Sequence, residues 1–473
     1  MTSRLANAAT AVVGLALATW LVGCGGHEAR TLKLRSALDA GAPRQAIAAI
    51  NEELDVKSDK DHPKSVVGDD ALLVLDRASV QQSLAQFALS KRDFEVADKA
   101  IDMLDLAHNA GDSIGQYVFS DSAGKYQAPP YEKLLVNTLN MLNYLELRDV
   151  PGALVEARRL AVVQRYVRDE LKEPDNSILG LGALLAGFAY EQSGAVDEAL
   201  RYYDEALQFG SFEAARVGVV RLLPRGSYRS PRLDKLAPPS NAAPGAAPSA
   251  SEGEAPPSDA PPPTPPAVDD SGDVLLVVGH GRVPHKVAER IPIGLALTLV
   301  ANDISPRDRL LATDLAAQGL VTWVNFPTLA PGQGEHATPA CSVDGRFVQM
   351  EQVVDVAHEV RAEWKKIEGK VILSAITRMI TRVAAGQGVR AAAGRDNAAV
   401  GILASLAVQG TLTALDTPDT RSWETLPARV VVSRLRLPPG RHRVVLDSRG
   451  WKREQTIEVA PRGFAVVSLM ALR

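Results

Sequence analysis

The polar segment DTPDTRSWETLP, residues 416–427, holds the side chains of this sequence best suited to binding chemistry. Asp419 and Glu424 carry carboxylates close to the guanidinium of Arg421, and Trp423 stands among them. An arginine–carboxylate pair has a fixed, bidentate geometry, so such a cluster either binds a ligand carboxylate or holds an irregular loop. We expect the second role, because a fixed loop alone accounts for the pattern.

Residue combinations that would indicate catalysis or metal binding are missing. The sequence contains no HExxH, no GxSxG, no phosphate-binding GxxxxGK[ST] and no dinucleotide-binding glycine motif. His280 and His285 are the closest histidine pair, but no nearby carboxylate or cysteine completes a metal shell, so we expect exposed imidazoles at a turn. Cys341 lacks the cations that activate a thiol, and we expect it to be buried. The sequence therefore predicts no catalytic residue, no metal site and no cofactor.

Composition narrows the class of protein further. The chain has 473 residues, a net charge of −4 and 46% apolar residues. Such a length allows roughly three domains. The mild acidity gives no electrostatic footprint for nucleic acid. Two cysteines exclude a disulfide scaffold.

The N-terminus reads MTSRLANAATAVVGLALATWLVGCGG, in which one cation, Arg4, precedes an apolar stretch from about Ala8 to Val22. The stretch is too short for a membrane span of about 20 residues and has the form of a secretory signal. It ends in the motif LVGC at Cys24, which closely resembles the lipobox of bacterial lipoproteins. The alternative is an ordinary secreted protein with a chance cysteine.

The lipobox resemblance implies that residues 1–23 are a signal peptide, that Cys24 is acylated and that residues 24–29 are a lipidated tether. Several acyl chains anchor a protein stably, since each buried CH₂ group contributes about 0.8 kcal/mol. Gly25, rather than an aspartate, follows the cysteine, which in Gram-negative lipoproteins implies the outer membrane. We expect the periplasmic face, with exposure to the medium as the alternative.

Residues 30–228 carry a helical pattern throughout, and the clearest repeating unit lies at residues 177–210. This unit resembles a tetratricopeptide repeat, a pair of antiparallel helices packed through small residues, at Gly187, Tyr190, Ala199 and Tyr203. Weaker copies align on three further second-helix alanines, Ala46, Ala97 and Ala153. The alternative is a bundle of unrelated helical hairpins, and both interpretations give an all-α domain.

In tetratricopeptide proteins the first helix of each hairpin lines a concave groove. The resemblance implies an apolar groove with an acidic edge along two first helices, at Leu135, Thr138, Leu142, Leu145, Leu181, Leu184, Phe188, Glu191 and Gln192. Such a groove suits an amphipathic helix or an extended peptide of a partner protein. The alternative is that the chain's own insertions or its C-terminal half fill the groove.

Residues 229–272 are rich in proline and alanine and contain no aromatic residue. Such a composition cannot bury enough apolar surface to fold, so we predict a disordered linker. An α+β domain is expected to follow over residues 273–427, with a long helix from near Glu351 and strands at Val274–Gly281 and Leu320–Pro327.

Residues 397–415 contain no charged side chain and are long enough to approach a membrane span. The segment also contains glycines, a glutamine and hydroxyl residues, and it lacks flanking aromatics. We therefore expect a helix buried inside the domain, with a membrane-inserted segment as the alternative.

Residues 428–473 are predicted to be β-structure. Arg434 and Arg436 alternate with leucines, as in a half-buried strand, and LPPG at residues 437–440 and Gly450 mark turns. This order of turns and strands resembles the small PEGA-type β-sandwich modules of bacterial envelope proteins. The resemblance implies a spacer or interaction module.

The whole layout resembles a family of uncharacterised bacterial lipoproteins. The features that carry the resemblance are the lipobox, the helical hairpins with NYLELRDVPGALVEARRL, a strand followed by HKVAERIPI, and DTRSWETLPARV. The predicted fold class is a multidomain α+β protein. It has all-α tetratricopeptide-like repeats, a disordered linker and an α+β domain that ends in a small β-sandwich-like module.

That family brings no established activity, so function is inferred from the layout. We expect a membrane-tethered adaptor or scaffold of envelope assembly or export, which binds an envelope protein or peptide in the repeat groove and is not an enzyme. One alternative is an envelope enzyme or accessory protein that acts on glycan or lipid. The other is a membrane-inserting component that uses residues 397–415.

Overall fold

The computed structural model describes residues 26–66, 69–101, 126–236, 269–302, 304–317, 323–392 and 418–473. The signal peptide with Cys24, residues 237–268 of the predicted linker and residues 397–415 lie outside the described residues. The described part is mixed α and β, with helices before residue 237 and every strand after residue 268. Among these residues, no helix combines the length and the apolar character that crossing a bilayer requires.

Consecutive helices of the N-terminal half form hairpins. These are α2 (His27–Asp39) with α3 (Pro43–Glu53), α4 (Asp69–Ser83) with α5 (Phe87–Ala100), α7 (Pro130–Glu146) with α8 (Val150–Asp169), and α9 (Ile178–Ser193) with α10 (Val196–Ala206). Two further helices follow, α11 (Glu213–Leu222) and the short α12 (Pro231–Asp234). The alanines aligned in the sequence all lie on second helices and are buried, at positions Ala46, Ala97, Ala153 and Ala199.

The close approach of α9 and α10 depends on Gly187. A β-carbon at this position would lie 2.6 Å from Cδ1 of the Tyr203 ring, closer than carbon atoms pack. Tyr203 is fully buried, and its hydroxyl donates a hydrogen bond to Glu191 at 2.5 Å. The small residue at Gly187 therefore has the spacing role that the sequence predicts for it.

All described strands except β2 and β3, which pair with each other, form two four-stranded sheets. The central sheet has the order β10-β1-β7-β6 and consists of β1 (Gly272–His280), β6 (Glu351–Asp355), β7 (Arg429–Leu437) and β10 (Phe464–Ala471). The outer sheet has the order β5-β4-β8-β9 and consists of β4 (Ala340–Val343), β5 (Arg346–Phe347), β8 (Gly440–Ser448) and β9 (Trp451–Val459). β1 pairs with β10 in parallel and with β7 antiparallel.

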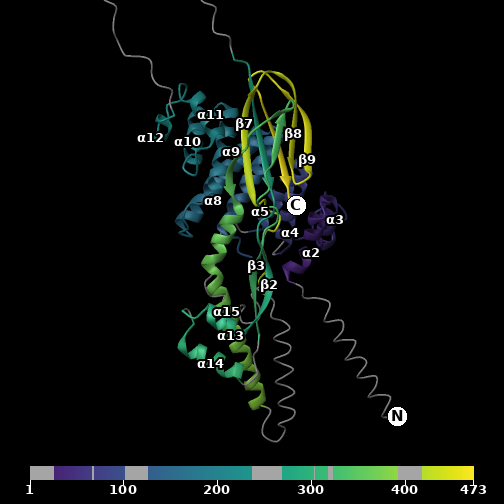
Figure 1. Cartoon of the computed structure of the whole chain (residues 1–473), viewed down its shortest axis with the longest axis vertical. Coiled ribbons are helices and arrows are strands. Elements are labelled where there is room, and N and C mark those ends of the chain that lie inside the picture. Colours follow the sequence, from purple (N-terminus) through teal and green to yellow (C-terminus); the bar gives the residue numbers. More distant parts are fainter. Residues whose placement is uncertain are drawn as a thin grey trace, which may run out of the picture.

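The central sheet lies between two apolar layers. Successive side chains of a strand point to opposite faces, so Val274, Leu276 and Val278 of β1 pack toward the outer sheet. Leu275 and Val277 instead join the core of the helical hairpins. Burial on both faces explains why β1 reads as an unbroken apolar run. Figure 1 shows the strands lying along the helices, with the outer sheet on the side away from them.

The predicted domain boundaries are wrong in two places. No boundary lies at residue 428, because β7 and β10 are hydrogen-bonded to β1 and the apolar layer of the sandwich combines strands from both predicted domains. The linker does not begin at residue 229 either. Leu233 is buried, and Arg232 donates to Asp204 at 2.5 Å, so residues 229–236 belong to the helical half.

One predicted helix start also shifts. Residues 351–355 form strand β6, paired with β7, and helix α15 (Val356–Ala392) begins only after it. Val353 and Val354 are both buried. Two apolar residues at the start of a helical pattern look the same in the sequence whether they belong to the helix or to a buried strand before it.

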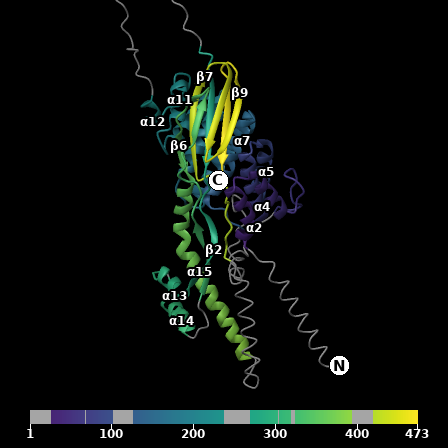
Figure 2. The same cartoon turned by 45° about the vertical axis from the view of Figure 1, so that its right-hand side comes forward.

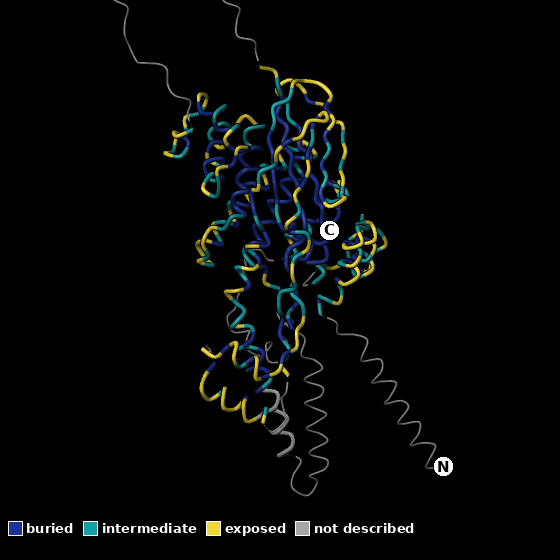
Figure 3. Tube along the Cα trace, viewed as in Figure 1, coloured by how far each residue is buried: buried dark blue, intermediate teal, exposed yellow. Residues whose placement is uncertain are grey.

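An arm extends from this body. β2 (His285–Pro292) and β3 (Trp323–Ala330) form an antiparallel ribbon, whose far end carries α13 (Ile293–Leu299) and α14 (Pro306–Ala317). The middle of α15, at residues 372–380, packs against α13 and α14 around a small apolar core of its own. We call these elements the arm. Figures 1 and 2 show it pointing away from the sheets, and in Figure 3 it is far less buried than the body.

The N-terminal helix is fastened to the base of the arm. α2 begins at His27, which is buried, so the predicted tether of residues 24–29 is too long. The backbone N–H of Glu28 donates to Thr420 Oγ1 at 3.1 Å, and its carboxylate accepts from the N–H of Ala288 at 2.7 Å. The chain is therefore fastened to the body at Glu28, two residues after Gly26, the first described residue.

The contact at Gly187 can be tested by adding one methyl group. We expect Gly187→Ala to lower the free energy of unfolding by about 1–3 kcal/mol, because the new β-carbon overpacks against Tyr203. Chemical denaturation followed by circular dichroism measures the change. Gly294→Ala is the matched control, since a β-carbon there meets no atom within 4 Å. Equal stability of Gly187→Ala and the wild type would contradict the spacing role.

Candidate functional site

The inner face of the helical hairpins is covered by the chain itself. α4 and α7 contact β10, and α9 contacts β6. The predicted groove residues lie in this contact layer: Leu135, Thr138, Leu142, Leu145, Leu181, Leu184 and Phe188 are buried, while Glu191 and Gln192 are half-buried. Of the two alternatives that the sequence leaves, the groove filled by the C-terminal half is the one observed. The seven buried residues are therefore not accessible to a partner in this structure.

Phe188 illustrates how the groove is filled. Its ring meets the ring of Phe464 on β10 edge to face, with centroids 5.8 Å apart. The guanidinium of Arg434 on β7 lies 5.1 Å from the centre of the same ring. Edge-to-face pairs and cation–π contacts both add to plain area burial.

Arg434 joins the two halves through buried ion pairs. Its Nη2 donates to Glu191 Oε2 at 2.7 Å and to Asp273 Oδ1 at 2.9 Å, and its Nη1 donates to the hydroxyl of Tyr203 at 2.9 Å. The polar face of β7 thus meets the helices. The sequence pattern of alternating arginine and leucine does not reveal this, because Glu191 and Asp273 are distant in the chain.

Residues 418–428, which we call the threading segment, run along the first helices of the hairpins. Trp423 is buried, its Nε1 donates to Ser79 Oγ at 3.1 Å, and its backbone N–H donates to Glu132 Oε1 at 3.0 Å. Its ring also packs edge to face on Phe94, with centroids 5.8 Å apart. A peptide-like segment of the chain itself therefore occupies part of the inner face.

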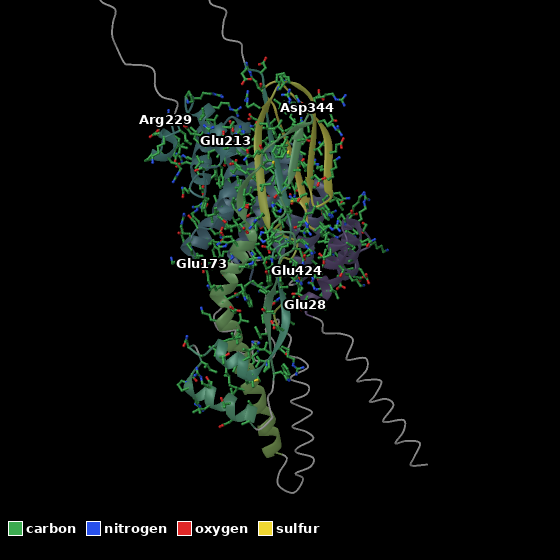
Figure 4. All side chains as sticks on the ribbon, viewed as in Figure 1. Glu28, Glu173, Glu213, Arg229, Asp344 and Glu424 are labelled. Atoms are coloured by element: carbon green, nitrogen blue, oxygen red, sulfur yellow. The ribbon has the colours of Figure 1, made fainter. Side chains whose placement is uncertain are left out.

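The predicted polar cluster lies on this segment, and the structure brings only part of it together. Arg421 donates from Nε to Asp419 Oδ1 and from Nη2 to Asp419 Oδ2, both at 2.8 Å. Glu424 pairs with Arg35 of α2 instead, at 2.7 Å. Figure 4 places Glu424 and Glu28 at the base of the arm, where α2 meets the threading segment. The cluster therefore anchors a loop, as the pattern predicts.

Burial shifts the titration of several of these carboxyl groups. Desolvation raises the pKa of Glu424 to about 7, although Arg35 opposes the shift. Desolvation also raises the pKa of Asp76 well above its usual range, with the charge of Glu424 adding to the effect. Asp76 accepts the backbone N–H of Thr425 at 3.1 Å and its hydroxyl at 2.8 Å. These two carboxyl groups hold the threading segment against α2 and α4.

The histidine pair does not form an exposed turn. His280 is buried and His285 is half-buried, and desolvation lowers the pKa of both, to about 4 for His285. Cys341 is buried, and desolvation raises the pKa of its thiol to about 11. No group of three metal-ligating side chains occurs within the described ranges.

A pocket of about 330 Å³ opens where the body joins the arm. Its walls come from the start of α7, the end of α8, the base of the ribbon, the threading segment and α15, and they include Tyr131, Lys133, Lys286, Glu363, Trp364 and Ile367. The volume is in the range of small-molecule or side-chain pockets. Apolar walls with amines and carboxylates among them suit an apolar side chain of a peptide with charged neighbours. The sequence gives no signal for this pocket, because its residues come from six separate segments of the chain.

Comparison with protein-family models, with curated proteins and with solved structures finds no match to this chain.

The raised pKa of Glu424 predicts a pH dependence of stability. Between the ordinary glutamate pKa of 4.5, which applies to the unfolded chain, and about 7, the carboxyl group of Glu424 is protonated in the folded chain only. The free energy of unfolding therefore falls as the pH rises through this window. We expect the free energy of unfolding to fall between about pH 5 and pH 8 by about 2–3 kcal/mol more in the wild type than in Glu424→Gln. Urea unfolding at a series of pH values measures this difference.

The control for this experiment is Glu458→Gln, which makes the same substitution at an exposed position of β9. We expect its pH profile to follow the wild type. Identical pH profiles of the wild type and Glu424→Gln would show that the carboxyl group titrates alike in the folded and unfolded chains.

Proposed function

We propose that this chain is a lipid-anchored scaffold of the bacterial outer membrane, which binds an envelope protein and catalyses no reaction. The observation that carries the proposal is the pocket at the base of the arm, whose walls come from both halves of the chain. The two halves form one body because the sheets and the threading segment cover the inner face of the hairpins. Four hairpins with buried second-helix alanines support a tetratricopeptide-like architecture. In this architecture the chain supplies its own groove ligand.

The lipid anchor follows from the lipobox that ends at Cys24. Gly26, the first described residue, lies two residues beyond the proposed acylated cysteine. Consecutive Cα atoms are 3.8 Å apart, so the acylated residue stays within roughly 8 Å of Gly26. The scaffold would therefore stand directly on the membrane.

The pocket is the proposed partner site because it lies beside the membrane-anchored helix and combines apolar and charged walls. Trp364 and Ile367 form an apolar wall, and Lys286 and Glu363 lie at the same pocket. An apolar side chain of a partner peptide would enter it, with charged neighbours meeting the amine and the carboxylate. This replaces the repeat groove as the binding surface.

A second candidate function rests on the two amines of the pocket, those of Lys133 and Lys286. Amines beside an aromatic wall also suit an anionic lipid or glycan group. In that case the chain would be an accessory protein of lipid or glycan handling.

Acylation at Cys24 can be tested with a fatty acid that carries an alkyne label. We expect wild-type cells to incorporate the label and Cys24→Ala to lose it entirely and to keep residues 1–23, because the thiol that carries the lipid is gone. Gel fluorescence and mass spectrometry measure both effects. Cys341→Ala is the control and should stay labelled, since Cys341 is buried in the sandwich. A labelled Cys24→Ala chain would remove the anchor from the proposal.

The partner site can be tested by photo-crosslinking in living cells. We expect a crosslinker at Ile367, and another at Glu363, to capture the same envelope protein, because both side chains line the pocket. Mass spectrometry identifies the adduct. A crosslinker at Val162, an exposed position of α8, serves as the control and should not capture that protein.

Three outcomes discriminate between the candidates. The same protein captured from the two pocket positions, and not from Val162, supports the scaffold. A lipid or glycan adduct from the pocket positions supports the second candidate. Equal capture from all three positions, or no adduct from the pocket, rejects the pocket as the partner site.

A further inference from the structure

Apolar side chains are exposed together at the far end of the arm. Between 40% and 68% of their surface is open to solvent, and we call them the tip patch: Leu295 and Leu299 of α13, Leu310 and Leu311 of α14, and Trp323 at the start of β3. They are five of the ten exposed large apolar side chains among the described residues, although the arm is a minor part of the chain. Several exposed apolar side chains on neighbouring elements indicate an interaction site.

The tip patch is not a by-product of packing inside the arm. α13 and α14 already bury one apolar face against α15, with Ile293, Ala296, Val300 and Ala312 in the small core of the arm. The leucines of the tip patch occupy the remaining surface of the same helices. α13 contains no charged side chain and is therefore apolar on both faces, which is typical of an interior or of lipid rather than of a surface in water.

The proposed anchor and the tip patch point to the same surface. The acylated residue stays within roughly 8 Å of Gly26, and Glu28 is hydrogen-bonded to Ala288, inside the ribbon. From Ala288 the ribbon continues to Pro292, which is four residues or about 13 Å farther. Figures 1 and 2 show the arm extending beyond α2, on the side away from the sheets. The far end of the arm therefore reaches at least as far as the anchor.

An aromatic–cation pair at the far end of the ribbon fits a membrane surface. The guanidinium of Arg290 lies 5.7 Å from the ring of Trp323. Tryptophan and arginine together are typical of the level of lipid headgroups.

We propose that the tip patch enters the acyl region of the membrane leaflet that holds the lipid anchor, with Trp323 and Arg290 at headgroup level. The proposal rests on the proposed anchor at Cys24 for the direction of the arm. The arm is then a second attachment point, which fixes the orientation of the body on the membrane and places the pocket at its surface.

Vesicle flotation tests the proposal without the acyl chain. The chain from Gly25 onward contains every described residue, and we mix it with vesicles of phosphatidylethanolamine and phosphatidylglycerol. The wild-type chain is expected to float with the vesicles. The combined variant Leu295→Glu, Leu299→Glu and Leu310→Glu should lower the ratio of bound to free chain at least about tenfold. Three leucines that enter the acyl region in the proposal are then replaced by carboxylates.

The matched control puts glutamates on three exposed apolar positions of the hairpins, Leu147, Val155 and Val162, which are 39–45% exposed. It is expected to float as the wild type does, and circular dichroism checks that both variants fold. No flotation of the wild type, or equal loss in both triple variants, overturns the proposal. Wild-type chain that stays off the vesicles but self-associates, with self-association lost in the tip variant, overturns it in favour of a second copy of the chain.

Tryptophan quenching gives a readout that needs no change of the tip leucines. In vesicles with brominated acyl chains, we expect quenching of the part of the emission that Trp323→Phe removes, since bromine quenches only nearby indoles. Unquenched Trp323 emission overturns the proposal. Neither experiment uses the acyl chain or the pocket, so their failure leaves the acylation and crosslinking results of the proposed function unaffected.

Discussion

The structure depends on covering the central sheet on both faces. β1 is buried along its whole length and alternates its side chains between the core of the hairpins and the core of the sandwich. A strand of this kind cannot face water on either side without losing about 25 cal/mol for each Å² of apolar surface exposed. The inner face of the hairpins has the same requirement. Each surface supplies the cover for the other, which is why the helical half and the sheets form one body rather than two domains on a flexible tether.

Buried polar contacts fix how these two surfaces meet. Arg434 bridges Glu191 and Asp273, and Glu146 of α7 accepts from Arg453 at 2.5 Å and from the hydroxyl of Ser468 at 2.7 Å. Taking such charges out of water costs several kcal/mol, which the pairing only offsets, so their contribution to net stability is small. Their geometry is nevertheless specific, since a shift of the sheet by one residue would leave each charge buried without its partner. The apolar layers thus provide the driving force, and the ion pairs select one register.

What the sequence predicts well is local. The run of apolar residues in β1, the hairpin at Gly187 and the turns at residues 437–440 and 450 follow from periodicity and turn chemistry among neighbouring residues. What it misses depends on distant segments. β1 pairs with β7 and β10, more than 140 residues along the chain, which removes the predicted boundary at residue 428. Arg434 looks like one polar position of a half-buried strand until Glu191 and Asp273 are placed beside it. The pocket has no sequence signal, because no single segment supplies more than part of a wall.

The way the groove is filled bears on where this protein can bind anything. A groove that is filled by the chain itself does not readily bind a partner peptide. Such a peptide would have to displace Trp423 and the buried contacts of the threading segment. The two surfaces proposed for binding, the pocket at the base of the arm and the tip patch at its end, are not used in joining the hairpins to the sheets. Both lie on the side where α2 begins. In the proposed function, the helical hairpins therefore hold the chain's own segments, and binding takes place at the surfaces nearest the proposed membrane anchor.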